Sequence, residues 1–207
     1  MIDVKQFGVG SSSMKLGDTR REKEEYAWVL DYLPYGYPDD KRPVYQKKPV
    51  VHLVGEKKFA LIEAIPKQNK VPQSQERLYI GEGEREMIDH VKKHLTYDEL
   101  THGAKVELPY VLEKIVTEKE KNFLPMYNES YAITTRLHML ELLPGIGKKT
   151  MWAVLDERKK GDFENFKDLM DRVKGMHHPE KLIAKRIEEE LQDDHIKYRI
   201  FTSHHGM

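Results

Sequence analysis

The 207-residue chain contains no cysteine. Disulfide bridges, zinc–thiolate sites and thiol catalysis are therefore excluded. The chain also lacks an apolar run of the roughly 20 residues that a membrane-spanning helix needs, and its first residues do not form the apolar core of a signal peptide. We therefore expect a cytoplasmic protein with no membrane partner.

The chain also lacks an excess of charge of either sign. Lys and Arg together number 35, as do Asp and Glu, so the chain carries no net charge near pH 7. A nucleic-acid partner would have to be recognised by local basic patches, because the overall charge provides no attraction. A hydrophobic share of 39% still allows a packed core, and the length suits one large or two small domains.

One short stretch organises the chain: residues 142–150, with the sequence Leu-Leu-Pro-Gly-Ile-Gly-Lys-Lys-Thr. Apolar residues at helical spacing predict one helix over 131–143 and a second over 150–158. Pro144 and the two glycines that follow predict a tight turn between these helices.

This turn is a candidate anion site. The amides of Gly145, Gly147 and Lys149 would lie at the start of the second helix, where backbone N–H groups lack an intrahelical partner and attract phosphate. The side chains of Lys148 and Lys149 add positive charge. The candidate binding residues are Gly145, Ile146, Gly147, Lys148, Lys149 and Thr150. The alternative is an ordinary corner between two helices that binds nothing.

The arrangement resembles the helix-hairpin-helix motif of nucleic-acid-binding proteins, whose hairpin has the sequence Leu-Pro-Gly-Ile-Gly-Lys. The resemblance implies that the turn grips the phosphates of one strand without recognising bases. A second such segment follows, with Val-Lys-Gly-Met at 173–176 and a predicted helix over 179–192. His177, His178 and Pro179 replace the second glycine and the lysines there. We therefore expect the second copy to serve packing alone.

The N-terminal half has the pattern of a small antiparallel β-barrel, because short aromatic and β-branched runs alternate with turn signals. The expected strands are 26–33, 49–54, 58–65, 75–80 and 104–108, with a helix over 84–95 before the last. Five short strands with a helix before the last match an OB-like barrel. The predicted fold class is thus α+β, an N-terminal OB-like β-barrel followed by an all-helical helix-hairpin-helix domain.

These patterns divide the chain into four segments. Residues 1–22, which contain Gly and Ser clusters, form a flexible leader or an edge strand. The OB-like barrel occupies 23–108, a linker helix 109–130, and the paired helix-hairpin-helix domain 131–207.

A basic segment accompanies the barrel. Residues 41–70 contain eight Lys or Arg against two acids and lie near several tyrosines. Such a mixture suits a groove for a single strand, since cations follow the phosphates and rings stack on bases. The candidate contacts are Lys47, Lys48, Tyr35 and Tyr37. The alternative is a solvated sheet edge blunted by lysines, with the aromatic residues filling the barrel.

The order of the two halves resembles an uncharacterised archaeal family of predicted RNA-binding proteins. The resemblance rests on Tyr-Ala-Trp-Val-Leu-Asp-Tyr-Leu at 26–33 and Leu-Pro-Gly-Ile-Gly-Lys-Lys at 143–149, and it extends over nearly the whole chain. It implies an OB-like domain plus a helix-hairpin-helix domain, with RNA as the ligand. It assigns no reaction.

The sequence offers no pattern of catalytic chemistry. His90 and His94 would share one side of the predicted helix, but the His-Glu-x-x-His order is missing and no third ligand is evident. Nothing assembles a nucleophile, a base and an oxyanion site. We expect no catalytic residue, no metal site and no cofactor.

The favoured hypothesis is a non-enzymatic protein that binds nucleic acid, RNA rather than DNA. The preference for RNA comes from the family resemblance alone, and it implies translation or ribosome-associated proteins as protein partners. Two alternatives stay open. The first is a DNA-binding accessory factor in repair or recombination, where the same hairpin occurs. The second is a protein-interaction module in which the charged helix 109–126 docks a protein and the hairpin is purely structural.

Overall fold

The computed structural model describes residues 23–202. The predicted leader or edge strand at 1–22 therefore lies outside the described residues. The described chain divides into two compact units, one of residues 23–111 with 201–202 and one of residues 112–200. The architecture is α+β, as predicted: the first unit holds an antiparallel sheet of five strands, and the second is mainly helical. Over residues 23–202, no helix is both long enough and apolar enough to cross a bilayer.

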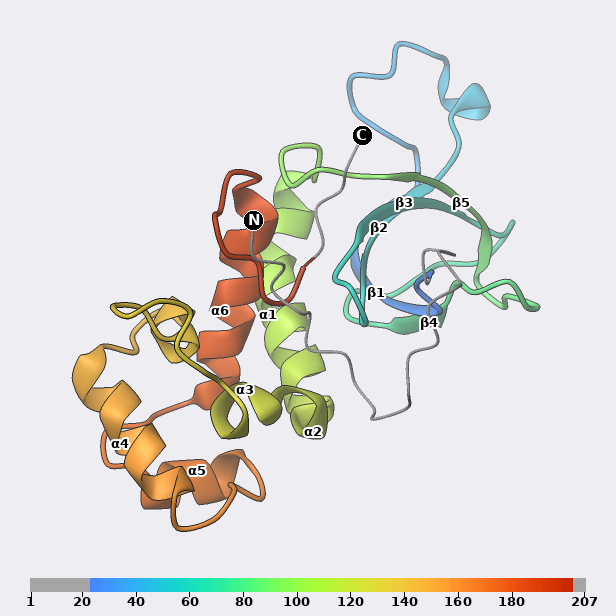
Figure 1. Cartoon of the computed structure of the whole chain (residues 1–207). Helices are drawn as coiled ribbons and strands as arrows, with labels where there is room; N and C mark the ends of the chain where they lie inside the picture. Colours follow the sequence, from blue (N-terminus) through green and yellow to red (C-terminus); the bar gives the residue numbers. More distant parts are fainter. Residues whose placement is uncertain (1–22, 203–207) are drawn as a thin grey trace, which may run out of the picture. The chain divides into compact units, whose positions relative to one another are not determined.

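The sheet consists of β1 (Tyr26–Leu33), β2 (Val50–Gly55), β3 (Leu61–Pro66), β4 (Arg77–Tyr79) and β5 (Ile88–His94). The strand order is β4-β1-β2-β3-β5, with every neighbouring pair antiparallel. The sheet curves strongly upon itself (Figure 1). Its apolar core comprises Ala27, Val29, Val51, Leu53, Ala60, Ile62, Ala64, Leu78, Ile80 and Ile88. The first four predicted strands are confirmed, although each differs slightly in its bounds except β1.

The predicted helix over 84–95 is wrong, because this segment contains β5. The strand pairs with β3 in a register that shifts twice, so Ile88, Val91 and His94 oppose alternate residues of β3. Ile88 and Val91 therefore reach the same core although they are three residues apart. A strand with two β-bulges thus imitates the i, i+3 spacing of a helix.

The predicted strand over 104–108 is also wrong, because it lies inside α1 (His102–Glu118). Thr101 caps this helix: its hydroxyl accepts a hydrogen bond from the Ala104 amide at 3.1 Å and donates one to Asp31 of β1 at 2.5 Å. A carboxylate near a helix N-terminus is favoured by the helix dipole. The predicted linker helix begins at Pro109, but this residue occupies the interior of α1.

The second unit begins within the predicted linker and contains short helices joined by tight turns. Two single turns, α2 (Glu120–Phe123) and α3 (Pro125–Asn128), follow α1. The longer helices are α4 (Lys148–Arg158), α5 (Phe166–Arg172) and α6 (Pro179–Gln192). The predicted helices over 150–158 and 179–192 are confirmed by α4 and α6.

The predicted helix over 131–143 is wrong. An isolated β-bridge joins Ala132 to His138, and a 3-10 turn, η2 (Met139–Leu142), follows. The hydroxyl of Thr134 accepts the amides of Arg136 at 3.2 Å and Leu137 at 3.0 Å. Such local bonding of a threonine side chain competes with the helical backbone ladder.

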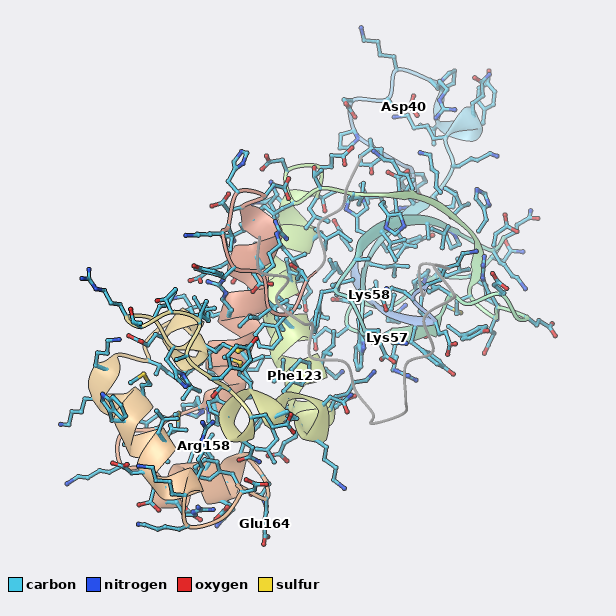
Figure 2. The ribbon with its side chains drawn as sticks, viewed as in Figure 1. Asp40, Lys57, Lys58, Phe123, Arg158 and Glu164 are labelled. Carbon is cyan, nitrogen blue, oxygen red and sulfur yellow. The ribbon has the colours of Figure 1, made fainter. Side chains whose placement is uncertain are left out.

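Arg158, at the end of α4, holds together the part of this unit that precedes the turn (Figure 2). Its guanidinium donates to the carbonyl oxygens of Tyr127, Asn128 and Ser130 at 2.8–3.2 Å, and to the Ser130 hydroxyl at 3.2 Å. The fork of N–H donors on an arginine can serve several separate acceptors at once.

Replacing Arg158 with lysine should therefore lower the free energy of unfolding by about 1–3 kcal/mol, because one ammonium cannot reach these separated acceptors. Urea unfolding followed by circular dichroism measures the change. The neighbouring exposed variant Lys159→Arg is the control and should stay within about 0.5 kcal/mol of the parent. Equal stability of both variants would show that the Arg158 contacts do not support the unit.

Candidate nucleic-acid interface

The turn before α4 has the conformation that its glycines predict. The Ile146 amide donates to the Leu143 carbonyl at 3.1 Å, and Gly145 has a φ of +89°. This positive φ at the third residue of a four-residue turn is the requirement of a type II turn, which glycine meets without strain. Leu143 and Ile146 are buried. Apolar anchors thus fix the turn to the core, and Ile146 points its side chain inward.

The start of α4 offers backbone donors. Gly147 is the N-cap residue of the helix. Across residues 23–202, no acceptor is bonded to the amides of Gly145, Gly147 or Lys149, the three that the sequence singled out. A Cβ placed on Gly147 would meet nothing within 4 Å. Space beside the positive end of the helix dipole is therefore open to an anion.

The two lysines of the turn differ in their surroundings. Lys148 donates through Nζ to the Arg136 carbonyl at 2.8 Å and to Glu141 Oε2 at 2.7 Å. Hydrogen bonds from Lys148 and from the His138 amide hold the pKa of Glu141 below its ordinary value. Lys148 thus supports the loop beside the turn, and Glu141 offsets its charge. Lys149 is exposed and follows in the first turn of α4.

Trp152 is a surface residue that sequence reasoning missed. It lies one helical turn after Lys148 and Lys149, and 57% of its surface is exposed. Residues three and four apart on a helix are neighbours on one face. The buried positions Met151 and Val154 define the apolar side of α4 and leave Trp152 outside it.

A second turn repeats the geometry of the first. The Met176 amide donates to the Val173 carbonyl at 3.1 Å, and Gly175 also has a φ of +89°. His178 then takes a left-handed conformation with a φ of 49°, and Pro179 begins α6. Proline has no amide hydrogen. The second turn therefore offers fewer donors at its helix start, and a role in packing alone stays a prediction for it.

The other candidate residues lie in the first unit, on the loop 34–49 between β1 and β2, which extends away from the sheet (Figure 1). A short 3-10 turn, η1 (Val44–Gln46), lies within this loop. A Cβ on Gly36, whose φ is +65°, would approach the Lys48 carbonyl to 3.0 Å, so the two ends of the loop come close together. Tyr35 is exposed, whereas Tyr37 is half-buried.

The basic residues of segment 41–70 do not form one patch. Lys57 and Lys58 follow the far end of β2 from the loop 34–49. Figure 2 shows them well apart from Asp40, which belongs to that loop. Only part of the predicted excess of positive charge therefore surrounds the candidate tyrosines.

The loop and the sheet enclose a hollow of about 260 Å³, called here the loop cleft. It is lined by Tyr37, Lys48, Val50, Ile65, His90 and Lys92, with the remainder of the lining supplied by the loop. His90 and Lys92 come from β5, which the sequence predicted as a helix, and were missed for that reason. Lys92 is an extra residue at a β-bulge, since β3 pairs with Val91 and Lys93 on either side of it.

Buried Glu63 anchors Tyr37 at this cleft. Glu63 is only 1% exposed. The Tyr37 hydroxyl donates to its Oε2 at 2.6 Å, and Lys92 donates to its Oε1. Burial raises the pKa of Glu63, but the hydrogen bonds from Lys92 and Tyr37 outweigh burial and leave the pKa below its ordinary value. Glu63 is therefore charged and holds the tyrosine in place.

His52 completes this network. Its Nε2 lies 2.8 Å from the Tyr37 oxygen. Because Tyr37 gives its proton to Glu63, the hydrogen on Nε2 must be the one donated to Tyr37. Nδ1 then accepts from the Thr101 amide at 3.5 Å. Burial lowers the pKa of His52, so the neutral ring satisfies both contacts.

Metal binding has no geometric support in the part of the chain that the structure describes, where no three His, Cys, Asp or Glu side chains are grouped to hold an ion. His90 and His94 lie on β5 rather than on a helix. The nearest partner of His90 is the adjacent Asp89, 2.7 Å from its Nδ1.

The lowered pKa of His52 predicts a loss of stability in acid. In the unfolded chain His52 has an ordinary pKa near 6.5, whereas the folded ring stays neutral at that pH. The free energy of unfolding therefore falls as the pH drops below 6.5, because the unfolded state binds a proton that the folded state does not. One such group contributes a slope of up to about 1.4 kcal/mol per pH unit. His52→Gln should be less stable at pH 7 and should flatten this dependence between pH 7 and 5.

Urea unfolding at three pH values tests the assignment. Burial and the charge of Arg158 also lower the pKa of His138, so the variant should retain part of the slope. An unchanged slope in His52→Gln would show that this ring does not titrate between the folded and unfolded states.

Comparisons with known proteins agree with this fold. The uncharacterized protein MJ0038 of Methanocaldococcus jannaschii is 50% identical over 180 residues, which are 86% of this chain and 80% of that protein. The crystal structure of Af1531 from Archaeoglobus fulgidus matches with 49% identity and a TM-score of 0.83, and covers 87% of this chain and 100% of that one.

These names carry no ligand or reaction, so nucleic-acid binding stays a prediction. A family model described as "Protein of unknown function (DUF655)" matches residues 23–203. The resemblance to an uncharacterised archaeal family is therefore confirmed, and the chain belongs to the DUF655 family.

Proposed function

We propose that this protein binds nucleic acid, RNA in preference to DNA, and catalyses no reaction. The observation that carries the proposal is the start of α4. Backbone amides without an acceptor in the described chain lie there beside an open Gly147 and an exposed Lys149. Donors of this kind at a helix N-terminus suit a phosphate group. The preference for RNA rests on the archaeal family resemblance, as do translation or ribosome-associated proteins as partners.

The helical unit supports a paired helix-hairpin-helix assignment through its two turns. Both have a glycine at a φ of +89°, and each is followed within a few residues by a helix, α4 or α6. The segment before the first turn departs from the motif, because a 3-10 turn replaces the first helix. The proposal therefore assigns the grip to the turn and to the start of α4 alone.

The sheet supports an OB-like assignment through its topology. An OB-fold is a five-stranded, partly open barrel whose first inter-strand loop contributes to oligonucleotide binding. The order β4-β1-β2-β3-β5 leaves β4 and β5 as the two edges, as a partly open barrel requires. The loop 34–49, with Tyr35, Tyr37, Lys47 and Lys48, is the first inter-strand loop. The proposal makes this loop the second contact with the strand.

A protein-interaction module is the second candidate function. Val106 is 51% exposed and Tyr110 is 61% exposed. The two residues are four apart on α1, so they share one face of the helix. An exposed apolar pair on a helix favours a protein partner, as the alternative drawn from the charged helix 109–126 suggested. DNA binding in repair or recombination has no observation here that favours it over RNA.

The matched variants Gly147→Asp and Gly147→Asn test the grip. Gly147 has a φ of −90° and an open neighbourhood, so both side chains fit, and both are good helix N-caps. They have almost the same shape and differ by one negative charge. If the α4 start holds a phosphate, Gly147→Asp should weaken binding about tenfold or more by repulsion, whereas Gly147→Asn should weaken it far less.

Fluorescence anisotropy with labelled single- and double-stranded RNA and DNA gives the affinities, and thermal melting checks that both variants are folded. Lys149→Met should also lower the salt slope of log K by about 0.7 for a single strand, because one fewer counterion is released. Equal affinity of the Asp and Asn variants for all four ligands would remove this turn as a contact. The second candidate function replaces the first if two results are found together: none of the four nucleic acids binds the parent protein, and a protein partner binds it but is lost when Val106 and Tyr110 are substituted.

A further inference from the structure

The loop cleft combines four features of a site for one nucleotide: its lining, its volume, a fixed tyrosine and one positive charge left unpaired within the described residues. Its lining residues include Tyr37, whose ring can stack on a base, and the aliphatic residues Val50 and Ile65. Its volume of about 260 Å³ is slightly below the roughly 300–1,000 Å³ of pockets that hold drug-sized ligands. A single flat ring system therefore suits the space better than a larger ligand.

The aromatic wall of the cleft is preorganised. The Tyr37 hydroxyl is fixed by Glu63 and His52 from two strands of the sheet. The backbone beside it is held by the close approach of Gly36 to the Lys48 carbonyl. A ring that is already immobile loses little conformational entropy when a base stacks on it.

The charges at the cleft leave an excess of one positive charge. Arg42 pairs with Asp40 through three side-chain hydrogen bonds, and Lys92 pairs with Glu63. Lys48 also lines the cleft and is exposed, and no acid within residues 23–202 pairs with it. One uncompensated cation beside an aromatic and aliphatic wall matches a base linked to one phosphodiester.

From this arrangement we infer that the loop cleft seats one unpaired nucleotide of a single strand, with its base against Tyr37, Val50 and Ile65 and its phosphate beside Lys48. The inference rests on the proposed function and deepens it. A base inside a duplex is stacked and paired on both sides, so it cannot enter the cleft unless it is turned out of the helix. The cleft therefore favours single-stranded nucleic acid over a duplex of the same sequence.

Two substitutions at Tyr37 separate the ring from its hydroxyl. Tyr37→Phe removes the anchor to Glu63 and keeps the ring, whereas Tyr37→Leu removes both. If a base stacks on this ring, Tyr37→Leu should weaken binding to a single-stranded RNA of about 12 nucleotides by about 5- to 150-fold relative to Tyr37→Phe. Binding to the same sequence as a duplex should change equally little in both variants.

Lys48→Met changes an exposed side chain, so we expect it to leave the fold intact. It should lower the salt slope for the single strand by about 0.7. An abasic substitution moved along the oligonucleotide should reduce affinity in the parent protein at the seated position, and this loss should vanish in Tyr37→Leu. Circular dichroism and thermal melting of each variant check the fold.

The outcomes separate this inference from the proposed function. If Gly147→Asp weakens binding about tenfold or more while Tyr37→Leu and Lys48→Met bind single strands as the parent does, only the cleft inference is overturned. If free AMP or UMP, titrated by NMR, binds the cleft more tightly than the single strand, the assignment to a strand is overturned. If the parent binds no RNA or DNA in any form, both the proposed function and the inference fall.

Discussion

The carboxylate of Glu63 is the group on which the first unit depends. It is charged and almost fully buried, and removing a charge from water costs several kcal/mol unless partners compensate for it. Its partners come from three places: Tyr37 from the loop, Lys92 from a bulge of β5, and His52 of β2 through the tyrosine oxygen. The loop therefore cannot swing away from the sheet without leaving this carboxylate unsatisfied. The loop 34–49, with its candidate binding residues, is therefore held rigidly against the sheet.

The helical unit obtains rigidity by a different route. Its turn at Gly145 is tied down by the buried side chains of Leu143 and Ile146, while Lys148 links the preceding loop to the helix start. The polar amides remain outside the core. The buried side chains hold the turn on one side, and the backbone amides stay exposed on the other side, where they can bind an anion. Each unit thus fixes its candidate loop through buried or hydrogen-bonded side chains, and in the described residues the amides of the turn before α4 keep no bonded acceptor.

The parts of the structure that the sequence predicted are those that local chemistry decides. The alternation in β1, the positive φ of Gly145 and the apolar periods of α4 and α6 all follow from neighbouring residues. Two of the errors arose where contacts distant in sequence decide: two bulges in the pairing with β3 gave β5 a helical spacing, and Thr101, bonded to Asp31 of β1, places the start of α1 ahead of Pro109. The third error, over 131–143, involves a local contact that apolar periodicity does not report, the bonding of the Thr134 hydroxyl to the amides that follow it. Within the candidate site, Tyr37 and Lys48 were predicted, but His90 and Lys92 became neighbours of Tyr37 only through strand pairing.

The two edges of the sheet have a consequence for the behaviour of the protein at high concentration. β4 has only three residues, and β5 is rich in charged side chains and interrupted by two bulges. An exposed strand can recruit the backbone of another molecule when it is long, flat and apolar, and neither edge meets these conditions. We therefore expect neither of these two edges to start intermolecular β-sheet growth, even though the sheet is not closed by pairing between them.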